Sequence, residues 1–110
     1  MEIMKRNVQC QIVTTTVAKR QDARRLAHLA VDAKLAACVQ ITPIHSVYRW
    51  RGKVESADEL LLTAKTRASR VPGLIRLIRA NHPYELPEIL VHKVDGGLPA
   101  YLAWVAAETR

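Results

Sequence analysis

The sequence predicts an α+β fold, in which two helices cover one face of an antiparallel sheet and a third helix is added at the C-terminus. Segments of strand and helix character follow each other in the order β-α-β-β-α-β, which is the ferredoxin-like plan. A glycine joins the two middle strand segments, as in a hairpin. The length of 110 residues is typical of one domain, so residues 1–110 are treated as a single unit.

The first strand and the first helix are predicted from a change in the spacing of apolar residues. Residues 8–16 are rich in β-branched side chains and alternate in polarity, and we expect Val8 and Ile12 on the buried face. From Lys19 to Ala37, leucines and alanines recur at steps of three and four residues. This spacing predicts an amphipathic helix of about five turns, whose alanine-rich face can approach the sheet closely.

The second and third strands are predicted on either side of Gly52. Residues 39–50 have β character, and Pro43 indicates a bulge or an edge strand because proline has no N–H group to donate. Arg51 and Gly52 form the short link of a hairpin. Residues 59–66 carry apolar side chains on both faces of their strand. We therefore expect further copies of this chain to cover the sheet face that has no helices.

The second half of the plan is predicted from turn signals. The second helix begins at Val71, with Ser69 as its expected N-cap. Residues 81–90, NHPYELPEIL, connect this helix to the last strand, since the second proline disfavours a helical conformation at the residue before it. The last strand covers residues 88–94. Pro99 begins the added terminal helix, because proline is favoured in a first helical turn.

Composition and charge exclude several classes of function. The net charge of +7 permits contact with nucleic acid, but the chain contains no Phe and offers no row of aromatic residues like that of RNA-recognition modules. No apolar run approaches the ~20 residues of a membrane span, and the N-terminus has no apolar signal segment. Cys10 and Cys38 are too far apart for a metal knuckle and are expected to be reduced thiols. We predict a cytoplasmic protein with neither a nucleic-acid nor a membrane partner.

The sequence also lacks the common catalytic motifs. It contains no glycine-rich phosphate loop, no HExxH and no GxSxG. Ser46 follows His45, but neighbouring residues of a strand point to opposite faces, so these two side chains cannot act together. The segment after the first strand does not resemble the arginine-containing loop of acylphosphatases. We predict that the protein is not an enzyme.

Polar and aromatic residues at the strand ends are the remaining candidates for a site. Imidazole and carboxylate groups suit transition metals, but no local spacing supplies the three or four ligands of a tight site. The alternative is a stiff connection, in which the tyrosine packs and the glutamates pair with basic residues. Spacing alone favours this alternative. The candidates are Tyr48, Trp50, Lys65, His82, Tyr84, Glu85 and Glu88.

Three segments, taken together, resemble the CutA divalent-cation tolerance family. They are KLAACV at residues 34–39, YRWRGK at residues 48–53 and HPYELPE at residues 82–88, and they occur in the order and at the spacing of that family. YLAWV at residues 101–105 is similar to the terminal helix of the family. The resemblance covers the chain from about residue 8 to residue 109.

The resemblance implies a ferredoxin-like subunit that assembles into a compact homotrimer. It also implies a response to copper and other divalent metal ions, with no established enzymatic reaction. The matching positions Trp50, Lys65, Tyr84 and Glu88 would lie around a pocket at the subunit boundary, and His82 would be the metal ligand.

Two departures from the family bear on copper. Members associated with copper binding have cysteine at the place of Thr15 and a second histidine at the place of Asn81; a hydroxyl and a carboxamide are poorer ligands for copper. We expect that no cofactor is required, and that copper or another divalent cation binds weakly through His82. The alternative function is a trimeric signalling or scaffold protein whose pocket binds a small anionic ligand or a partner, and Lys65 and Arg67 favour an anion.

Overall fold

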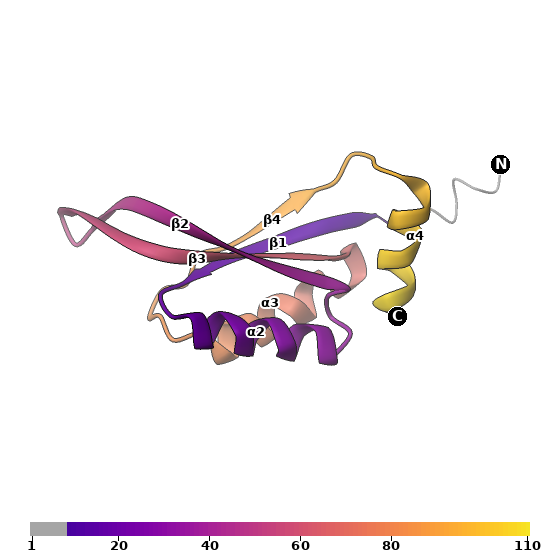
Figure 1. The fold of residues 1–110 in the computed structure, drawn as a ribbon, viewed down its shortest axis with the longest axis horizontal. Coiled ribbons are helices and arrows are strands. Elements are labelled where there is room, and N and C mark those ends of the chain that lie inside the picture. Colours follow the sequence, from indigo (N-terminus) through magenta and orange to yellow (C-terminus); the bar gives the residue numbers. More distant parts are fainter. Residues whose placement is uncertain (1–8) are drawn as a thin grey trace.

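A computed structural model describes residues 9–110 and confirms the α+β, ferredoxin-like prediction. One antiparallel sheet of four strands has the order β2-β3-β1-β4, and α2 and α3 lie side by side against one of its faces (Figure 1). Val8 lies outside the described residues. The elements are β1 (Cys10–Val17), α2 (Arg20–Asp32), β2 (Cys38–Trp50), β3 (Lys53–Arg67), a 3-10 turn (Ala68–Arg70), α3 (Val71–Asn81), β4 (Ile89–Lys93) and α4 (Pro99–Glu108).

The core lies between the sheet and the helices α2 and α3. Val13 and Val17 of β1 are fully buried and face the helices together with their partners on β3, Ala64 and Leu60. The predicted buried face of β1 was therefore the wrong one. Ile12 points to the opposite face and is only half-buried, because both helices pack on the other side of the strand. Each helix adds an apolar stripe to this core: Ala23, Leu26 and Ala30 from α2, and Val71, Leu74 and Ile78 from α3.

Helix α2 is shorter than predicted. It ends at Asp32 and does not continue to Ala37. Lys34 adopts a left-handed conformation (φ 59°), and the backbone N–H of Ala36 donates to the carbonyl of Ala30 over 3.2 Å. This reversal closes the helix end in the manner of a C-terminal capping motif. Ala36 is still buried, so the apolar periodicity continues past the helix although the helix itself does not.

Strands β2 and β3 form a long hairpin that extends beyond the body of the sheet (Figure 1). Arg51 and Gly52 both have positive φ angles, 49° and 81°, as a tight two-residue hairpin turn requires. Pro43 lies on β2, which is an edge strand with a partner on one side only. The edge-strand prediction is confirmed. Proline has no N–H group to donate to a neighbouring strand, and an edge strand tolerates this because it has a neighbour on one side only.

The beginning of α3 differs from the prediction. Ser69 lies inside the 3-10 turn and makes no capping hydrogen bond to the helix. The N–H of Val71 donates to the carbonyl of Ala68, so the turn runs directly into the helix. The prediction of Ser69 as N-cap was wrong because the N-cap needs an extended backbone, and Arg70, which precedes the helix, is already helical.

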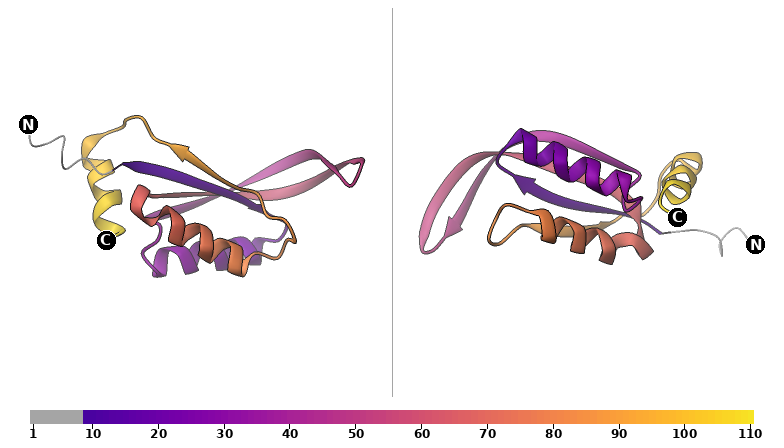
Figure 2. Two further views of the ribbon diagram at one scale, coloured as in Figure 1. Left: turned by 180° about the vertical axis from the view of Figure 1, so that it is seen from behind. Right: turned by 90° about the horizontal axis from the view of Figure 1, so that it is seen from below.

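Helix α4 stands at the end of the sheet remote from the hairpin tip (Figure 2). Val105 is the buried residue of this helix, and Thr109, which follows the helix as its C-cap, is buried as well. The Nε groups of Arg67 and Arg70 both donate to the carbonyl oxygen of Thr109, over 3.1 and 2.6 Å. These bonds attach the C-terminal end of the chain to the end of β3 and to the turn after it. The sheet face opposite α2 and α3 keeps apolar side chains in water, among them Leu90, which is 51% exposed.

Candidate functional site

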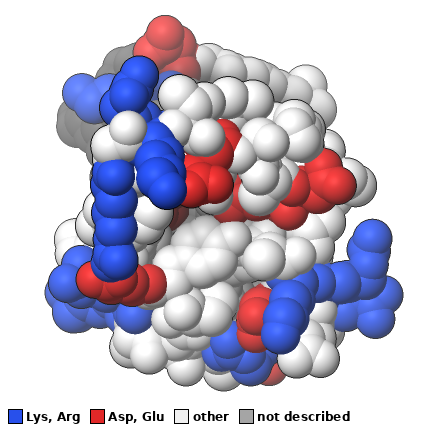
Figure 3. Space-filling model, turned by 90° about the vertical axis from the view of Figure 1, so that its left-hand side faces the viewer, with Lys and Arg blue, Asp and Glu red and all other residues white. Residues whose placement is uncertain are grey.

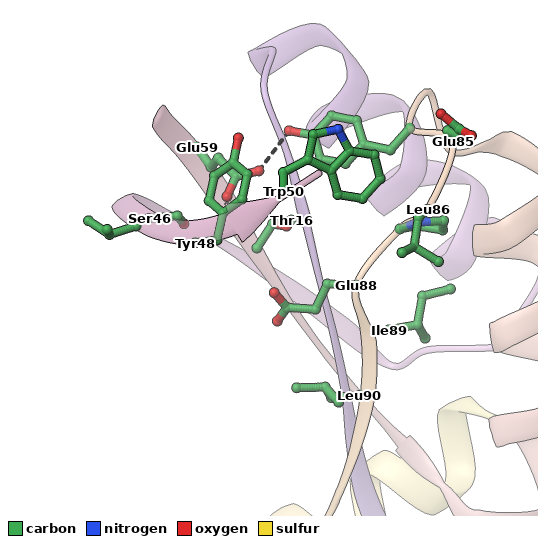
Figure 4. Close-up of a pocket in the computed structure, with 13 residues that line it drawn as sticks. Thr16, Ser46, Tyr48, Trp50, Glu59, Glu85, Leu86, Glu88, Ile89 and Leu90 are labelled. Atoms are coloured by element: carbon green, nitrogen blue, oxygen red, sulfur yellow. Dashed lines mark hydrogen bonds between the residues drawn. The ribbon is translucent and has the colours of Figure 1, made fainter. Parts of the chain in front are cut away.

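A pocket of about 880 Å³ lies on the sheet face opposite α2 and α3, at the end near the hairpin (Figure 4). Three parts of the chain form its wall. The hairpin contributes residues 46–48, Trp50 and Glu59, the end of β1 contributes Thr16, and the connection from α3 into β4 contributes residues 84–90. The volume is within the range of about 300–1,000 Å³ found for sites of small molecules.

The structure brings together three of the four predicted pocket residues. Trp50, Tyr84 and Glu88 line the pocket, but Lys65 does not. Lys65 and Glu59 lie on the same face of β3, six residues apart, which is ~20 Å along an extended strand. The ammonium group of Lys65 lies 5.7 Å from the ring centroid of Tyr101 on α4, at the opposite end of the sheet.

The hairpin supplies the aromatic part of the wall. Tyr48 and Trp50 alternate along β2 and so point to the same face, where they are 43% and 37% exposed. The guanidinium carbon of Arg51 lies 5.2 Å from the ring centroid of Trp50, and an Nη of Arg51 donates to Glu85 over 3.1 Å. One aromatic ring and one carboxylate therefore already hold a guanidinium group at the rim.

The charge of the pocket has the opposite sign to that of the whole chain. Its wall contains Glu59, Glu85 and Glu88, and none of the described residues that line it is Lys, Arg or His. Figure 3 shows Asp and Glu side chains gathered in the middle of this end of the molecule, with Lys and Arg side chains at the margins. Sequence reasoning missed Glu59. Its signal was a carboxylate at the start of an otherwise apolar strand segment, on the face that the helices leave open.

A hydrogen bond joins two sides of the pocket. The hydroxyl of Tyr84 donates to Glu59 over 2.7 Å (Figure 4). Burial raises the pKa of Tyr84 well above its usual value, and the hydrogen bond to Glu59 raises it further. The phenol is therefore a neutral donor, which leaves its oxygen lone pairs and the second Glu59 oxygen available to a ligand.

His82 lies behind Tyr84 and has both ring nitrogens engaged. The backbone N–H of Tyr84 donates to Nδ1 over 3.1 Å, so the proton of the neutral ring is on Nε2. Nε2 lies 2.9 Å from the carbonyl oxygen of Thr16 and 3.1 Å from Oγ1 of Thr15. Burial lowers the pKa of His82, although the bond to Thr16 partly opposes this effect. A metal ion at His82 would have to replace one of these hydrogen bonds.

The two residues that depart from the copper-associated pattern, Thr15 and Asn81, also form hydrogen bonds within the chain. Thr15 is buried and contacts the ring of His82, so the structure brings these two positions together. The side-chain amide of Asn81 donates to the carbonyl of Leu77 over 2.8 Å, back along α3. Within residues 9–110, no group of three or more His, Cys, Asp and Glu side chains is placed to hold a metal ion.

The fold and this arrangement of residues can be compared with known proteins. The family model described as "CutA1 divalent ion tolerance protein" matches residues 11–108. The chain belongs to the CutA1 divalent ion tolerance family. Among the relatives, the chain is 40% identical over 100 residues to "Divalent-cation tolerance protein CutA" of Thermus thermophilus, covering 90% of this chain and 97% of that protein.

Plant and cyanobacterial relatives extend the comparison. The chain is 43% identical over its whole length to "Protein CutA, chloroplastic" of Arabidopsis thaliana, but spans only 61% of that protein. Among solved structures, CutA1 of Oryza sativa superposes with a TM-score of 0.90 at 42% identity, covering 94% of this chain and 96% of the other. "PII-like protein CutA" of Nostoc sp. PCC 7120 superposes with a TM-score of 0.85 at 36% identity, covering 91% and 97%.

The cellular location of the chain stays a prediction. Two plant members of the family are named chloroplastic, and a structure from Archaeoglobus fulgidus is titled periplasmic. No helix within residues 9–110 has the length and apolar character needed to cross a bilayer. Neither observation tests the expectation of a cytoplasmic protein.

Proposed function

We propose that this chain forms a homotrimer that takes part in the response to divalent metal ions, by binding and not by catalysis. Membership of the CutA1 family and the name of the Thermus relative support the link to divalent cations. The acidic pocket is the structural observation that carries the proposal, because Glu59 and Glu88 attract cations to this end of a chain whose net charge is +7, beside Glu85, which is paired with Arg51 at the rim.

Self-association is supported by the sheet face opposite α2 and α3. Leu90 on β4 is 51% exposed, and β2 and β4 are both edge strands whose outer sides have no partner within the described residues. Exposed edges and apolar patches of this kind are usually covered by another chain. Light scattering of the purified protein is expected to give three times the 12.3 kDa of one chain. A monomer mass at micromolar concentration would contradict the proposed assembly.

We further propose that copper or another divalent cation binds weakly, with His82 as its principal ligand and no cofactor required for folding. The ion must compete with the bonds from His82 to Thr16 and Tyr84, which limits its affinity. Calorimetric titration with Cu(II) is expected to show weak binding that His82→Ala removes. His28→Ala is the matched control, because His28 is exposed on α2, away from this site. Equal affinities in the two variants would exclude His82 as the ligand.

The alternative function, a signalling or scaffold protein that binds a small anion, has less support. Lys65 was the cation that favoured it, and Lys65 lies at the far end of β3. Arg67 donates to the carbonyl of Thr109 and is also remote from the pocket. An anion in this pocket would face Glu59 and Glu88, and the nearest basic side chain, Arg51 at the rim, is already paired with Glu85.

A further inference from the structure

We propose that the outer face of α2 binds an acidic segment of a partner protein, a helix that carries carboxylates along one side. This site is separate from the pocket beside Tyr84, and the inference does not depend on metal binding. Self-association is expected to cover the sheet face opposite the helices. In the right-hand view of Figure 2, α2 and α3 lie in front of the sheet, and no other described element lies over them. The outer face of α2 therefore stays accessible in an assembly that covers the sheet.

A shallow groove of about 560 Å³ lies on the outer side of α2. Arg20, Arg24 and His28 recur at intervals of four residues, so they share one side of the helix and are spaced about 6 Å apart along its axis. Gln21 and Arg25 complete the wall, and none of the described residues that line the groove is Asp or Glu. A row of donors at this interval matches carboxylates at the same interval on a second helix.

One arginine of the groove is already held in place. An Nη of Arg25 donates to the carboxylate of Asp22 over 3.1 Å and to the carbonyl of Asn81, at the end of α3, over 3.0 Å. Both bonds use the same nitrogen, so the other N–H groups of this guanidinium remain available to a ligand. Because Arg25 is fixed before binding, its contact with a partner loses little conformational entropy. Its pairing with Asp22 also offsets the negative charge nearest to the groove.

The other two arginines of the groove have no ion-pair partner among the described residues. Arg20 and Arg24 are both exposed, and neither lies within 4 Å of a described carboxylate. The neighbouring helix α3 contributes Arg76 and Arg79 and contains no acidic residue. The helical layer therefore attracts anionic partners over a distance. The planar fork of arginine suits carboxylates in particular, because it can donate two parallel hydrogen bonds to one of them.

Other polyanions fit this surface less well. Single-stranded nucleic acids are held by bases that stack on aromatic rings, and neither α2 nor α3 contains Phe, Tyr or Trp. The row from Arg20 to His28 is about 12 Å long, and Asp32 follows it, which is unfavourable for the continuous phosphate backbone of a duplex. An anionic membrane would require apolar side chains beside the arginines, and the described wall of the groove has none.

A fluorescein-labelled, alanine-based helical peptide with glutamates spaced by four residues is the probe that tests this proposal. Its fluorescence anisotropy is expected to show saturable binding with a dissociation constant on the order of 0.1 mM, which weakens as the salt concentration rises. The same peptide with glutamine at these positions is expected not to bind. A single-stranded and a duplex oligonucleotide, compared at an equal concentration of negative charge, are expected to bind more weakly. Tighter binding of an oligonucleotide that Arg24→Gln weakens would make this a nucleic-acid surface and overturn the proposal.

Two variants of equal charge separate the groove from the general basic charge of the chain. Arg24→Gln removes one positive charge from the groove and is expected to weaken binding of the acidic peptide about threefold; adding Arg20→Gln is expected to bring the loss to about tenfold. Arg76→Gln removes the same charge from α3, outside the wall of the groove, and is expected to change the affinity little. All three arginines are exposed, so the variants keep the core intact. Equal weakening by Arg24→Gln and Arg76→Gln, or no saturable binding of the peptide, would overturn the proposal.

Discussion

The hydroxyl of Tyr84 donates to Glu59 over 2.7 Å, and this one bond joins the connection after α3 to the middle of β3. The two residues are 25 positions apart in the sequence and form opposite sides of the same pocket. Behind Tyr84, the ring of His82 packs edge-on at a centroid distance of 4.9 Å. The shape of the pocket therefore depends on a short chain of contacts that runs from His82 through Tyr84 to Glu59.

Tyr84→Phe is expected to destabilise the protein, because it removes a charge-assisted hydrogen bond and leaves Glu59 without its partner. The expected loss is about 1 kcal/mol in the free energy of unfolding. Chemical denaturation at one fixed protein concentration measures it. Tyr101→Phe removes a phenol oxygen that makes no hydrogen bond to the described residues, and is expected to change stability much less. Equal losses in both variants would mean that the bond to Glu59 contributes little.

The parts of this structure that sequence reasoning predicted have local causes. The hairpin at Gly52 follows from two residues that adopt positive φ angles, and the order of strands and helices along the chain follows from the alternation of segments. The edge position of Pro43 follows from its missing N–H group. Each of these signals involves only neighbouring residues, so no knowledge of the tertiary packing was needed.

The parts that sequence reasoning missed depend on distances across the sheet. Family resemblance assigned Lys65 to a pocket at the subunit boundary; within one chain it lies six extended residues from Glu59 on the same face, and its assignment to the boundary pocket stays a prediction. Glu59 was overlooked because its role appears only when β3 and the connection after α3 are seen together. The hydrogen bonds of His82 could not be predicted from the sequence either, since its ring nitrogens bond to the carbonyl of Thr16 and to the backbone N–H of Tyr84.

The stability of the protein is expected to fall as the pH decreases below the ordinary pKa of histidine, 6.5, because burial lowers the pKa of His82 in the folded state. In that window the unfolded chain binds a proton that the folded chain does not, so the contribution of His82 is present above pH 6.5 and is lost as the pH falls through its folded pKa. Free energies of unfolding measured from pH 7.5 downward, at steps of about one unit, test this expectation.

Two variants assign the pH dependence to its source. His82→Gln is expected to flatten the decline below pH 6.5, since glutamine does not titrate. His28→Gln removes an exposed histidine of α2 and is expected to leave the decline unchanged. If both variants followed the same curve as the parent protein, another group would be responsible for the acid sensitivity.

Gly52→Ala is expected to destabilise the protein by about 1 kcal/mol, because a Cβ atom disfavours the left-handed conformation that the turn requires. The φ angle of Gly52 is +81°, and no other atom lies within 4 Å of the position of an added Cβ. Gly96→Ala is a matched control: its added Cβ also meets nothing within 4 Å, but its backbone does not have a positive φ. Thermal or chemical denaturation of the two variants isolates the backbone contribution. Equal stabilities would show that the hairpin turn tolerates a side chain at residue 52.

Thr15→Cys is expected to raise the affinity for copper by about tenfold or more, because a thiolate is a much stronger ligand than a hydroxyl. Oγ1 of Thr15 lies 3.1 Å from Nε2 of His82, so the new sulfur would lie beside the imidazole. Thr66→Cys is the matched control, since Thr66 is also a buried threonine of the sheet, its hydroxyl has no hydrogen-bond partner among the described residues, it lies beside Gln11 and not beside Thr15, and the variant has the same number of thiols. Both variants retain Cys10 and Cys38, so the difference between them reports on the position alone. Competition titrations against a copper chelator measure the copper affinity of each variant. An equal gain in affinity in both variants would show that the new thiol does not act together with His82.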